Sequence, residues 1–277
     1  MEERSITLLD KETVSIQLYS VKDNAPVLLF FPAMGVRAEF YKPFAATLNQ
    51  AGITCVTADL RGLGTSSVRP SSKVDFGYKE MIEDVSVIVQ QVKEIFPNQS
   101  LYIGGHSLGG QIVSLYVGKN PKAVSGLVLI AACSIFYKGW QGSEQLKTRM
   151  GITFFPLLSK LFGYFPGDKV GFGGKGAKTM LLDWSHVGKT SKYEIINDPF
   201  DYETAMATTA IPIFSAVIEG DWMAPQLAIQ NLYRKFNSDS SVTEFALTKA
   251  AVGKSLNHFN WVKNGERLTE EISDWLA

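Results

Sequence analysis

A serine flanked by glycines is the strongest chemical signal in the 277-residue sequence. It lies in the segment GHSLG at residues 105–109, which has the form G-x-S-x-G. The strand-like Leu101–Gly104 runs directly into this segment, and the helical pattern of Leu108–Lys119 runs directly out of it. A sharp strand-to-helix turn strains the backbone of its central residue and needs small residues two positions away on each side, whereas a serine that only caps a helix does not. We therefore expect Ser107 to be a nucleophile held above a sheet.

A serine hydroxyl needs a base within hydrogen-bond reach, and the chain has three histidines. His106 adjoins the serine, so its side chain points away from it and we expect a packing role. His186 lies in a segment without predicted strands. His258 follows the last predicted strand, and the carboxyl ends of parallel strands converge on one edge of a sheet. His258 is therefore the predicted base, and the alternative is a solvated loop histidine.

The carboxylate that orients the base should lie on the same edge of the sheet. Asp221 follows the strand-like Ile211–Ile218 and a glycine that lets the chain turn, and it is the predicted acid. Glu219 is nearer the end of the strand and is the second candidate for this acid. Asp198 and Asp201 precede the strand and would lie at its opposite end.

Acyl transfer also needs two backbone N–H groups for the oxyanion. The geometry of the turn makes Leu108, the residue after the nucleophile, one donor. The other should come from the loop that follows the strand-like Val27–Phe31. Pro32 has no N–H, so Met34 is the predicted second donor. The alternative for Met34 is an ordinary loop methionine.

Buried apolar runs alternate with helical patterns through much of the chain, which predicts a mostly parallel α/β sheet with helices on both faces. An antiparallel hairpin, from Ser5–Leu9 and Thr13–Tyr19, is expected at the sheet edge. The further predicted strands are Val27–Phe31, Ile53–Ala58, Leu101–Gly104, Leu127–Ala131, Ile211–Ile218 and Val242–Leu247. The predicted helices are Phe40–Gln50, Gly77–Phe96, Leu108–Lys119, Ala224–Phe236 and Gly265–Leu276.

The alternation stops at residues 134–209, which contain no matching strand pattern but many aromatic residues and a glycine-rich stretch at 163–176. We interpret residues 134–209 as a helical cap above the sheet, with the α/β core formed by residues 1–133 and 210–277. The cap is expected to act as a substrate lid. The alternative is a packed helical subdomain without a role in ligand binding.

The composition limits the partners and cofactors that we expect. Lys plus Arg and Asp plus Glu are 27 each, and this balance argues against nucleic-acid binding. Cys55 and Cys133 lie in apolar runs and are predicted to be buried free thiols, too few for a disulfide scaffold or a four-thiolate zinc site. Metal-ligand spacings and phosphate-binding loops are missing, so we expect neither metal nor cofactor.

The apolar runs also bear on the location of the chain. The first twenty residues carry charges where a signal peptide would have its apolar core. The longest apolar run, Gly126–Ala132, is too short to cross a bilayer. We therefore expect a soluble, cytoplasmic protein with no stable membrane insertion. Homo-oligomers are possible, but the sequence does not reveal them.

These features together resemble the α/β-hydrolase superfamily. The order Ser107, Asp221, His258 is the order of its catalytic residues, residues 59–66 (DLRGLGTS) resemble its D-x-R-G-x-G-x-S loop, and residues 220–225 resemble its acid loop. The chain is most similar to the serine aminopeptidase and monoacylglycerol lipase-like branch, and in particular to a group of predicted bacterial α/β hydrolases. One departure is Pro32-Ala33, where the branch usually has His-Gly; backbone donation by Met34 survives this change.

The sequence therefore predicts a metal-independent serine hydrolase that forms an acyl-enzyme on a small-molecule acyl substrate. The aromatic cap favours an uncharged acyl ester, so a carboxylesterase or lipase-like enzyme is the first hypothesis. An acyltransferase or a peptidase or amidase with the same catalytic residues is the second. The third is a ligand-binding homologue without catalysis. A haloalkane dehalogenase is disfavoured, because its nucleophile would be Asp at the position of Ser107.

Overall fold

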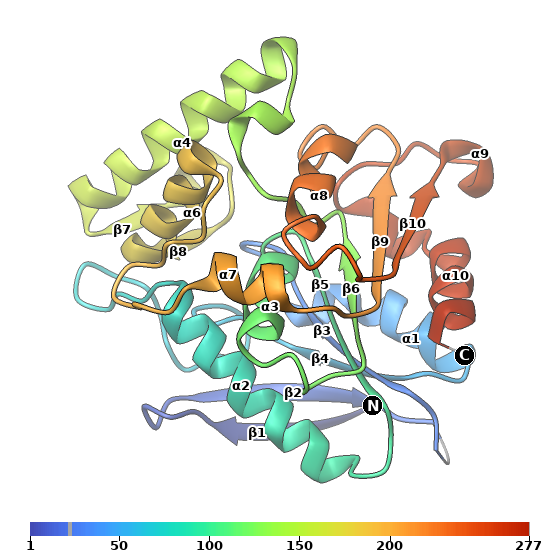
Figure 1. Ribbon diagram of the computed structural model, residues 1–277. Helices are drawn as coiled ribbons and strands as arrows, with labels where there is room; N and C mark the ends of the chain where they lie inside the picture. Colours follow the sequence, from blue (N-terminus) through green and yellow to red (C-terminus); the bar gives the residue numbers. More distant parts are fainter. Residues whose placement is uncertain (22–23, 277) are drawn as a thin grey trace.

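The computed structural model describes residues 1–21 and 24–276, which form an eight-stranded sheet with helices on both faces (Figure 1). The strands lie in the order β1-β2-β4-β3-β5-β6-β9-β10. β1 pairs antiparallel with β2 and β2 antiparallel with β4, while all pairs from β4 to β10 are parallel. The predicted α/β fold with a mostly parallel sheet is confirmed. The strands of this sheet are β1 (Glu2–Thr7), β2 (Thr13–Tyr19), β3 (Val27–Phe31), β4 (Thr54–Ala58), β5 (Leu101–His106), β6 (Gly126–Ile130), β9 (Ile213–Ile218) and β10 (Val242–Leu247).

The helices for which ranges were predicted lie close to those ranges, whereas the short helix Lys249–Val252 lies in a segment predicted as a loop. α2 and α7 each pack against α3 on one face of the sheet, and α1 and α10 pack together on the other (Figure 1). The α-helices are α1 (Lys42–Gln50), α2 (Tyr78–Ile95), α3 (Leu108–Lys119), α4 (Gly142–Phe162), α5 (Gly167–Val170), α6 (Lys178–Thr190), α7 (Tyr202–Thr208), α8 (Gln226–Tyr233), α9 (Lys249–Val252) and α10 (Glu266–Leu276). Short 3-10 helices are η1 (Ala38–Tyr41), η2 (Tyr137–Gly139) and η3 (Asn260–Lys263).

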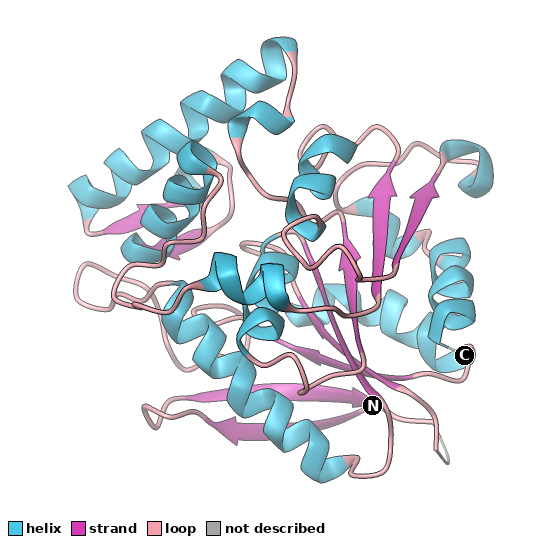
Figure 2. Cartoon of the chain, in the orientation of Figure 1, coloured by secondary structure: helices cyan, strands magenta, loops and turns pink. Residues whose placement is uncertain are grey.

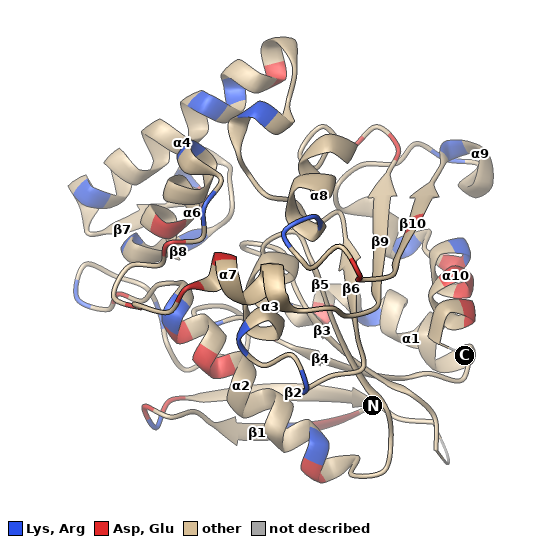
Figure 3. Cartoon of the chain, viewed as in Figure 1, with Lys and Arg blue, Asp and Glu red and all other residues tan. Residues whose placement is uncertain are grey.

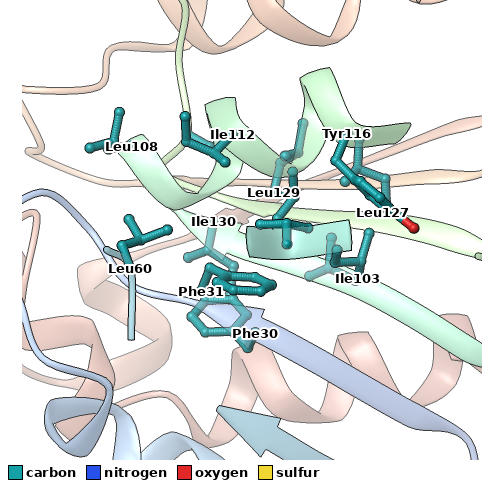
Figure 4. Packing of buried hydrophobic residues seen from close by; sticks show 14 of the residues in the cluster. Phe30, Phe31, Leu60, Ile103, Leu108, Ile112, Tyr116, Leu127, Leu129 and Ile130 are labelled. Carbon is teal, nitrogen blue, oxygen red and sulfur yellow. The ribbon is translucent and has the colours of Figure 1, made fainter. Parts of the chain in front are cut away.

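The core lies between the sheet and its helices, and it explains why the central strands are apolar throughout. All five residues of β3, of β4 and of β6 are buried, because helices cover both faces of these strands. In Figure 4, Ile112 and Tyr116 of α3 lie above Leu127 and Leu129 of β6. Since α3 is buried along nearly its whole length, its first turn is held firmly against the sheet.

The segment between β6 and β9 differs from the prediction in one respect. It contains a two-stranded antiparallel sheet, β7 (Tyr164–Pro166) with β8 (Lys175–Ala177), where no strand was expected (Figure 2). These strands have three residues each and lie in a glycine-rich stretch, so they lack the alternation that identifies longer strands. α4 and α6 pack together beside this small sheet, whereas α7 packs on α3.

Charged residues are distributed over the surface elements. Figure 3 shows Lys and Arg at several turns of α4, whereas α10 carries both signs. Across residues 1–21 and 24–276, no helix combines the length and the apolar character needed to cross a membrane.

Candidate active site

The turn from β5 into α3 gives Ser107 an unusual backbone. Its φ is 53° and its ψ is −115°, a conformation that non-glycine residues rarely adopt. The flanking glycines make this turn possible. A Cβ on Gly105 would lie 2.4 Å from the carbonyl carbon of Gly109, and a Cβ on Gly109 would lie 2.5 Å from the carbonyl oxygen of Phe31. The turn therefore needs glycine at both positions, as the G-x-S-x-G pattern indicated.

His258 and Asp221 form a buried pair in the loops that follow β10 and β9. His258 Nδ1 lies 2.6 Å from Asp221 Oδ2, and both side chains are buried. Asp221 Oδ1 accepts a hydrogen bond of 2.8 Å from the backbone N–H of Met223, so the orientation of the carboxylate is fixed. A carboxylate accepts only, so Nδ1 carries a proton, and in the neutral imidazole Nε2 then keeps its lone pair. This leaves Nε2 as the basic atom of the imidazole.

Ser107 and His258 both line a cavity of about 310 Å³ between the sheet edge and the 134–209 segment. No hydrogen bond joins Ser107 Oγ to His258 in the part of the chain that the structure describes. Most of the lining is aromatic, aliphatic or sulfur-containing. Residues 134–209 contribute Ile135, Trp140, Lys147, Thr148, Gly151, Phe155, Gly171, Phe172, Gly173 and Trp184, and the rest of the chain contributes Ala33, Met34, Ser107, Leu108, Gln111, Cys133, Trp222, Met223, His258 and Phe259.

Two backbone N–H groups beside Ser107 are available to an incoming oxygen. Within residues 1–21 and 24–276, neither the N–H of Met34 nor that of Leu108 donates a hydrogen bond, and both residues line the cavity. The N–H of Ala33 is occupied, because it donates to the Tyr41 hydroxyl at 3.0 Å. Of these three N–H groups, those of Met34 and Leu108 are therefore not engaged within the described residues.

His106 is fully buried and packs against His258, in line with its predicted packing role. Its Nδ1 lies 2.7 Å from the Tyr41 hydroxyl, and its ring centroid lies 4.5 Å from that of His258. Burial, and then the nearby His258, hold the pKa of His106 well below its ordinary value. His106 is therefore neutral, and a proton taken up by His258 does not meet a second positive imidazole.

The remaining sequence candidates are engaged elsewhere. Nε2 of His186 lies 3.0 Å from Oε2 of Glu194, which is also within residues 134–209. Glu219, the second candidate for the acid, is exposed and accepts from the backbone N–H at the start of α9. Asp198 accepts from a tyrosine hydroxyl, and Asp201 caps the N-terminus of α7. None of these four residues lines the cavity in the described part of the chain.

The loop at residues 59–66 supports the site from a distance. The Asp59 carboxylate accepts from the backbone N–H groups of Ala38 at 2.7 Å and Thr65 at 2.9 Å. Arg61 forms two hydrogen bonds with Asp84, of 2.8 and 2.6 Å. These bonds tie the loop after β4 to η1 and α2, so the loop has a structural role.

Two residues near the site were not identified from the sequence. Tyr41 connects the loop of Met34 with His106, but in the sequence it reads as one apolar residue of a helix. Gln111 is 2% exposed and lines the cavity. Its position four residues after Ser107, on the same face of α3, is the sequence signal that could have identified it.

The cysteines and possible metal ligands can also be assessed. Cys55 and Cys133 are buried free thiols, as predicted. Burial raises the pKa of both, so they stay protonated. Among residues 1–21 and 24–276, no group of three or more His, Cys, Asp and Glu side chains is arranged to hold a metal ion.

Known structures share this fold at low sequence identity. A soluble variant of monoglyceride lipase from Saccharomyces cerevisiae superimposes with a TM-score of 0.71 at 16% identity, covering 99% of this chain and 94% of that one. The α/β hydrolase GrgF from Penicillium sp. sh18 gives 0.66 at 16% identity, covering 99% and 97%. Est1E from Butyrivibrio proteoclasticus, with ferulic acid bound, gives 0.64 at 14% identity, covering 98% and 97%.

Sequence comparison gives one short match and one family. The acyltransferase drtE from Aspergillus calidoustus is 36% identical over 75 residues, which are 27% of this chain and 24% of the acyltransferase. This match thus spans about a quarter of that relative's length. The model of the family "Serine aminopeptidase, S33" matches residues 22–163, about half of the chain. Together with the sheet order, this match establishes that the chain belongs to the serine aminopeptidase S33 family of α/β hydrolases.

Proposed function

We propose that this chain is a serine hydrolase that cleaves uncharged carboxylic esters through an acyl-enzyme at Ser107. One observation carries the proposal. The cavity that holds the strained Ser107 also holds His258, whose Nδ1 is fixed by Asp221 at 2.6 Å. A hydroxyl, an imidazole and a carboxylate in this arrangement form the machinery of nucleophilic acyl transfer. The nucleophile is then activated by an imidazole rather than by a metal ion.

The proposed first half-reaction acylates the serine. Ser107 Oγ attacks the ester carbonyl carbon, while His258 Nε2 takes the hydroxyl proton. Asp221 stabilises the imidazolium, and the N–H groups of Met34 and Leu108 donate to the oxyanion. The tetrahedral intermediate then expels the alcohol, which receives the proton from His258. Hydrogen bonds of this kind are often long without substrate, so Ser107 and His258 need to approach each other only when substrate binds.

The second half-reaction releases the acid. Water attacks the acyl carbon of Ser107 and gives a proton to His258 Nε2. Collapse of the second tetrahedral intermediate returns that proton to Ser107 Oγ and frees the carboxylic acid. Throughout, His106 stays neutral beneath His258, so it does not compete for the proton.

The lining of the cavity favours an ester with an apolar acyl group. Trp140, Trp184 and Trp222 contribute large apolar surfaces, together with Phe155 and Phe172. The cation in the lining, Lys147, pairs with a glutamate at 2.9 Å, which offsets its charge. An uncharged acyl chain can therefore leave water for this cavity at low cost in desolvation.

The test is turnover of short p-nitrophenyl esters by Ser107→Ala. We expect kcat to fall by at least ~10³-fold because the nucleophile is removed. Ser114→Ala is the matched control, since Ser114 is a buried serine on the helix that follows Ser107, and its hydroxyl donates to the carbonyl of Gly110 at 2.7 Å. The control should keep its activity. Turnover by Ser107→Ala close to that of the wild type would overturn the proposal.

A second candidate is acyl transfer to an alcohol or amine by the same acyl-enzyme. The similarity to the drtE acyltransferase, though limited to 75 residues, is the observation that favours it. Product analysis with competing alcohols and amines separates the two functions. More ester or amide than free acid would favour transfer, and an excess of acid would favour hydrolysis. A peptidase or amidase, suggested by the name of the family, would cleave an anilide with an acyl group identical to that of the best ester.

A further inference from the structure

Gln111 places an uncommitted amide group in an otherwise apolar cavity. The residue is 2% exposed, and it lines the cavity together with Ser107. Its Oε1 accepts a hydrogen bond of 3.1 Å from the Tyr78 hydroxyl. Its Nε2 donates to no other group in residues 1–21 and 24–276. This nitrogen is not among the buried polar atoms that lack both a partner and accessible surface, so it can donate to a ligand in the cavity that Gln111 lines.

Neighbouring residues hold the amide in this orientation. Tyr78 is fully buried at the first turn of α2, and its backbone N–H donates to Asp183 Oδ2 at 2.9 Å. Burial raises the pKa of Tyr78 well above its ordinary value, so the hydroxyl keeps its proton. The Tyr78 hydroxyl donates one hydrogen bond to Gln111 Oε1, so neither N–H group of Nε2 is used by Tyr78.

The position of Gln111 on α3 gives an approximate distance between its side chain and the carbon that Ser107 would attack. The backbone N–H of Gln111 donates to the carbonyl of Ser107 at 3.2 Å, so the two residues are one helical turn apart. One turn corresponds to about 6 Å along the axis, and helical side chains lean toward the N-terminus. A distance of this size corresponds to roughly four single bonds along an extended chain.

We infer that Gln111 Nε2 forms a polar subsite that binds an oxygen atom of the acyl chain, a few bonds beyond the scissile carbonyl. This inference rests on the proposed function and narrows its substrate class to acyl groups with an ether, hydroxyl or keto oxygen. The aromatic walls hold the carbon atoms of the chain, and the amide nitrogen selects the oxygen. A plain alkyl chain leaves the amide unpaired, which is why such a site discriminates against it.

The kinetic test uses p-nitrophenyl hexanoate and its 3-oxa, 4-oxa and 5-oxa analogues, which have equal chain length. For each analogue, the kcat/KM relative to hexanoate is compared between the wild type and Gln111→Met. Differences in intrinsic reactivity cancel in this comparison. For at least one oxygen position we expect the relative kcat/KM to fall at least about tenfold in Gln111→Met, the effect of one hydrogen bond. Changes within twofold at all three positions would overturn the inference.

Two further variants separate binding from folding. Gln111→Met keeps the length and helix propensity of the side chain, and its thermal unfolding is measured first. If Gln111→Met does not fold, Tyr78→Phe decides, because it frees the amide to rotate and should reduce the same preference. Ser114→Ala, on the same helix, should keep the wild-type preference. An unchanged preference in Tyr78→Phe would then overturn the inference.

A binding experiment distinguishes failure of the subsite from failure of the proposed function. Ser107→Ala and Ser107→Ala/Gln111→Met are titrated with methyl hexanoate and its three oxa analogues. Binding is followed by the fluorescence of Trp140, Trp184 and Trp222, which line the cavity. We expect the oxa preference only where Gln111 is present, whether or not the wild type hydrolyses esters. If the wild type shows no turnover but Ser107→Ala still prefers an oxa analogue, the proposed function alone is contradicted. If Ser107→Ala and Ser107→Ala/Gln111→Met bind each ligand with equal affinity, the subsite is contradicted.

Discussion

Asp221→Asn should abolish most of the activity by reversing the tautomer of His258. In the structure, Asp221 Oδ1 accepts from the N–H of Met223 at 2.8 Å, and Oδ2 faces His258 Nδ1 at 2.6 Å. An asparagine must keep its oxygen toward the Met223 N–H, so its amide nitrogen turns toward His258. A donor then faces Nδ1, and the imidazole adapts by placing its proton on Nε2. Nε2 can no longer take the proton of Ser107.

The size of the effect follows from the role of the imidazole. Loss of the basic tautomer in such an arrangement costs about 10⁴-fold in kcat, which corresponds to about 5 kcal/mol in the activation free energy. KM should change little, because Asp221 does not line the cavity in the described residues. The assay is steady-state hydrolysis of a p-nitrophenyl ester, with thermal unfolding to verify that the variant is folded.

Glu219→Gln is the matched control for this prediction. Glu219 lies two residues from Asp221 and is exposed, and it contacts the backbone of α9 rather than His258. We expect its kcat to stay within a few-fold of the wild type. If kcat falls less than tenfold in Asp221→Asn, or falls equally in Glu219→Gln, the reasoning is refuted and Asp221 is not supported as the acid.

Two further predictions concern buried groups around the site. Tyr41→Phe leaves the N–H of Ala33 and Nδ1 of His106 without their partner, so we expect the free energy of unfolding to fall by about 2 kcal/mol and kcat to fall more than KM rises. Chemical denaturation measures the first change, and ester kinetics measure the second. An unaltered kcat would contradict the idea that Tyr41 helps to position the loop that carries Met34. Burial raises the pKa of Asp183 to about 6, above its ordinary value of 3.8, so the folded state binds its proton more tightly than the unfolded state. Below pH 4 the Asp183 carboxyl therefore does not change the free energy of unfolding. As the pH rises to 6, it lowers this free energy by up to about 3 kcal/mol. The free energy of unfolding of Asp183→Asn, relative to that of the wild type, should therefore increase between pH 4 and pH 6. A difference that does not change with pH would contradict the raised pKa of Asp183.

The main elements of the fold were predictable because each carried a strong local signal. α3 was predicted with the correct bounds, since the glycine-rich turn precedes it and Asn120-Pro121 ends it. β3 and β10 were also correct, because β3 is an uninterrupted apolar run and β10 places Val, Thr and Phe directly after the polar turn residues 237–241. The bounds of β2 were correct as well, and those of several other elements moved by a few residues, as at β1, which is Glu2–Thr7 rather than Ser5–Leu9.

The missed features depend on contacts between distant residues. The strands β7 and β8 are stabilised by pairing across a glycine-rich loop, so neither has a pattern of its own. Tyr41 binds Ala33 and His106 from a separate element, a relation that spacing along the chain does not encode. The structure brings His258 and Asp221 together, 37 residues apart in the sequence, because parallel strands end at the same edge. That rule made this pair predictable, whereas no comparable rule exists for Tyr41.

The rate at which a fluorophosphonate modifies Ser107 tests the central proposal most directly. The adduct is located by peptide mass spectrometry, and its rate of formation is compared between the wild type and His258→Ala. We predict modification at Ser107, slowed at least ~10²-fold in His258→Ala because the base is lost. Modification at another side chain, or an equal rate in the two proteins, would contradict the proposed catalytic arrangement.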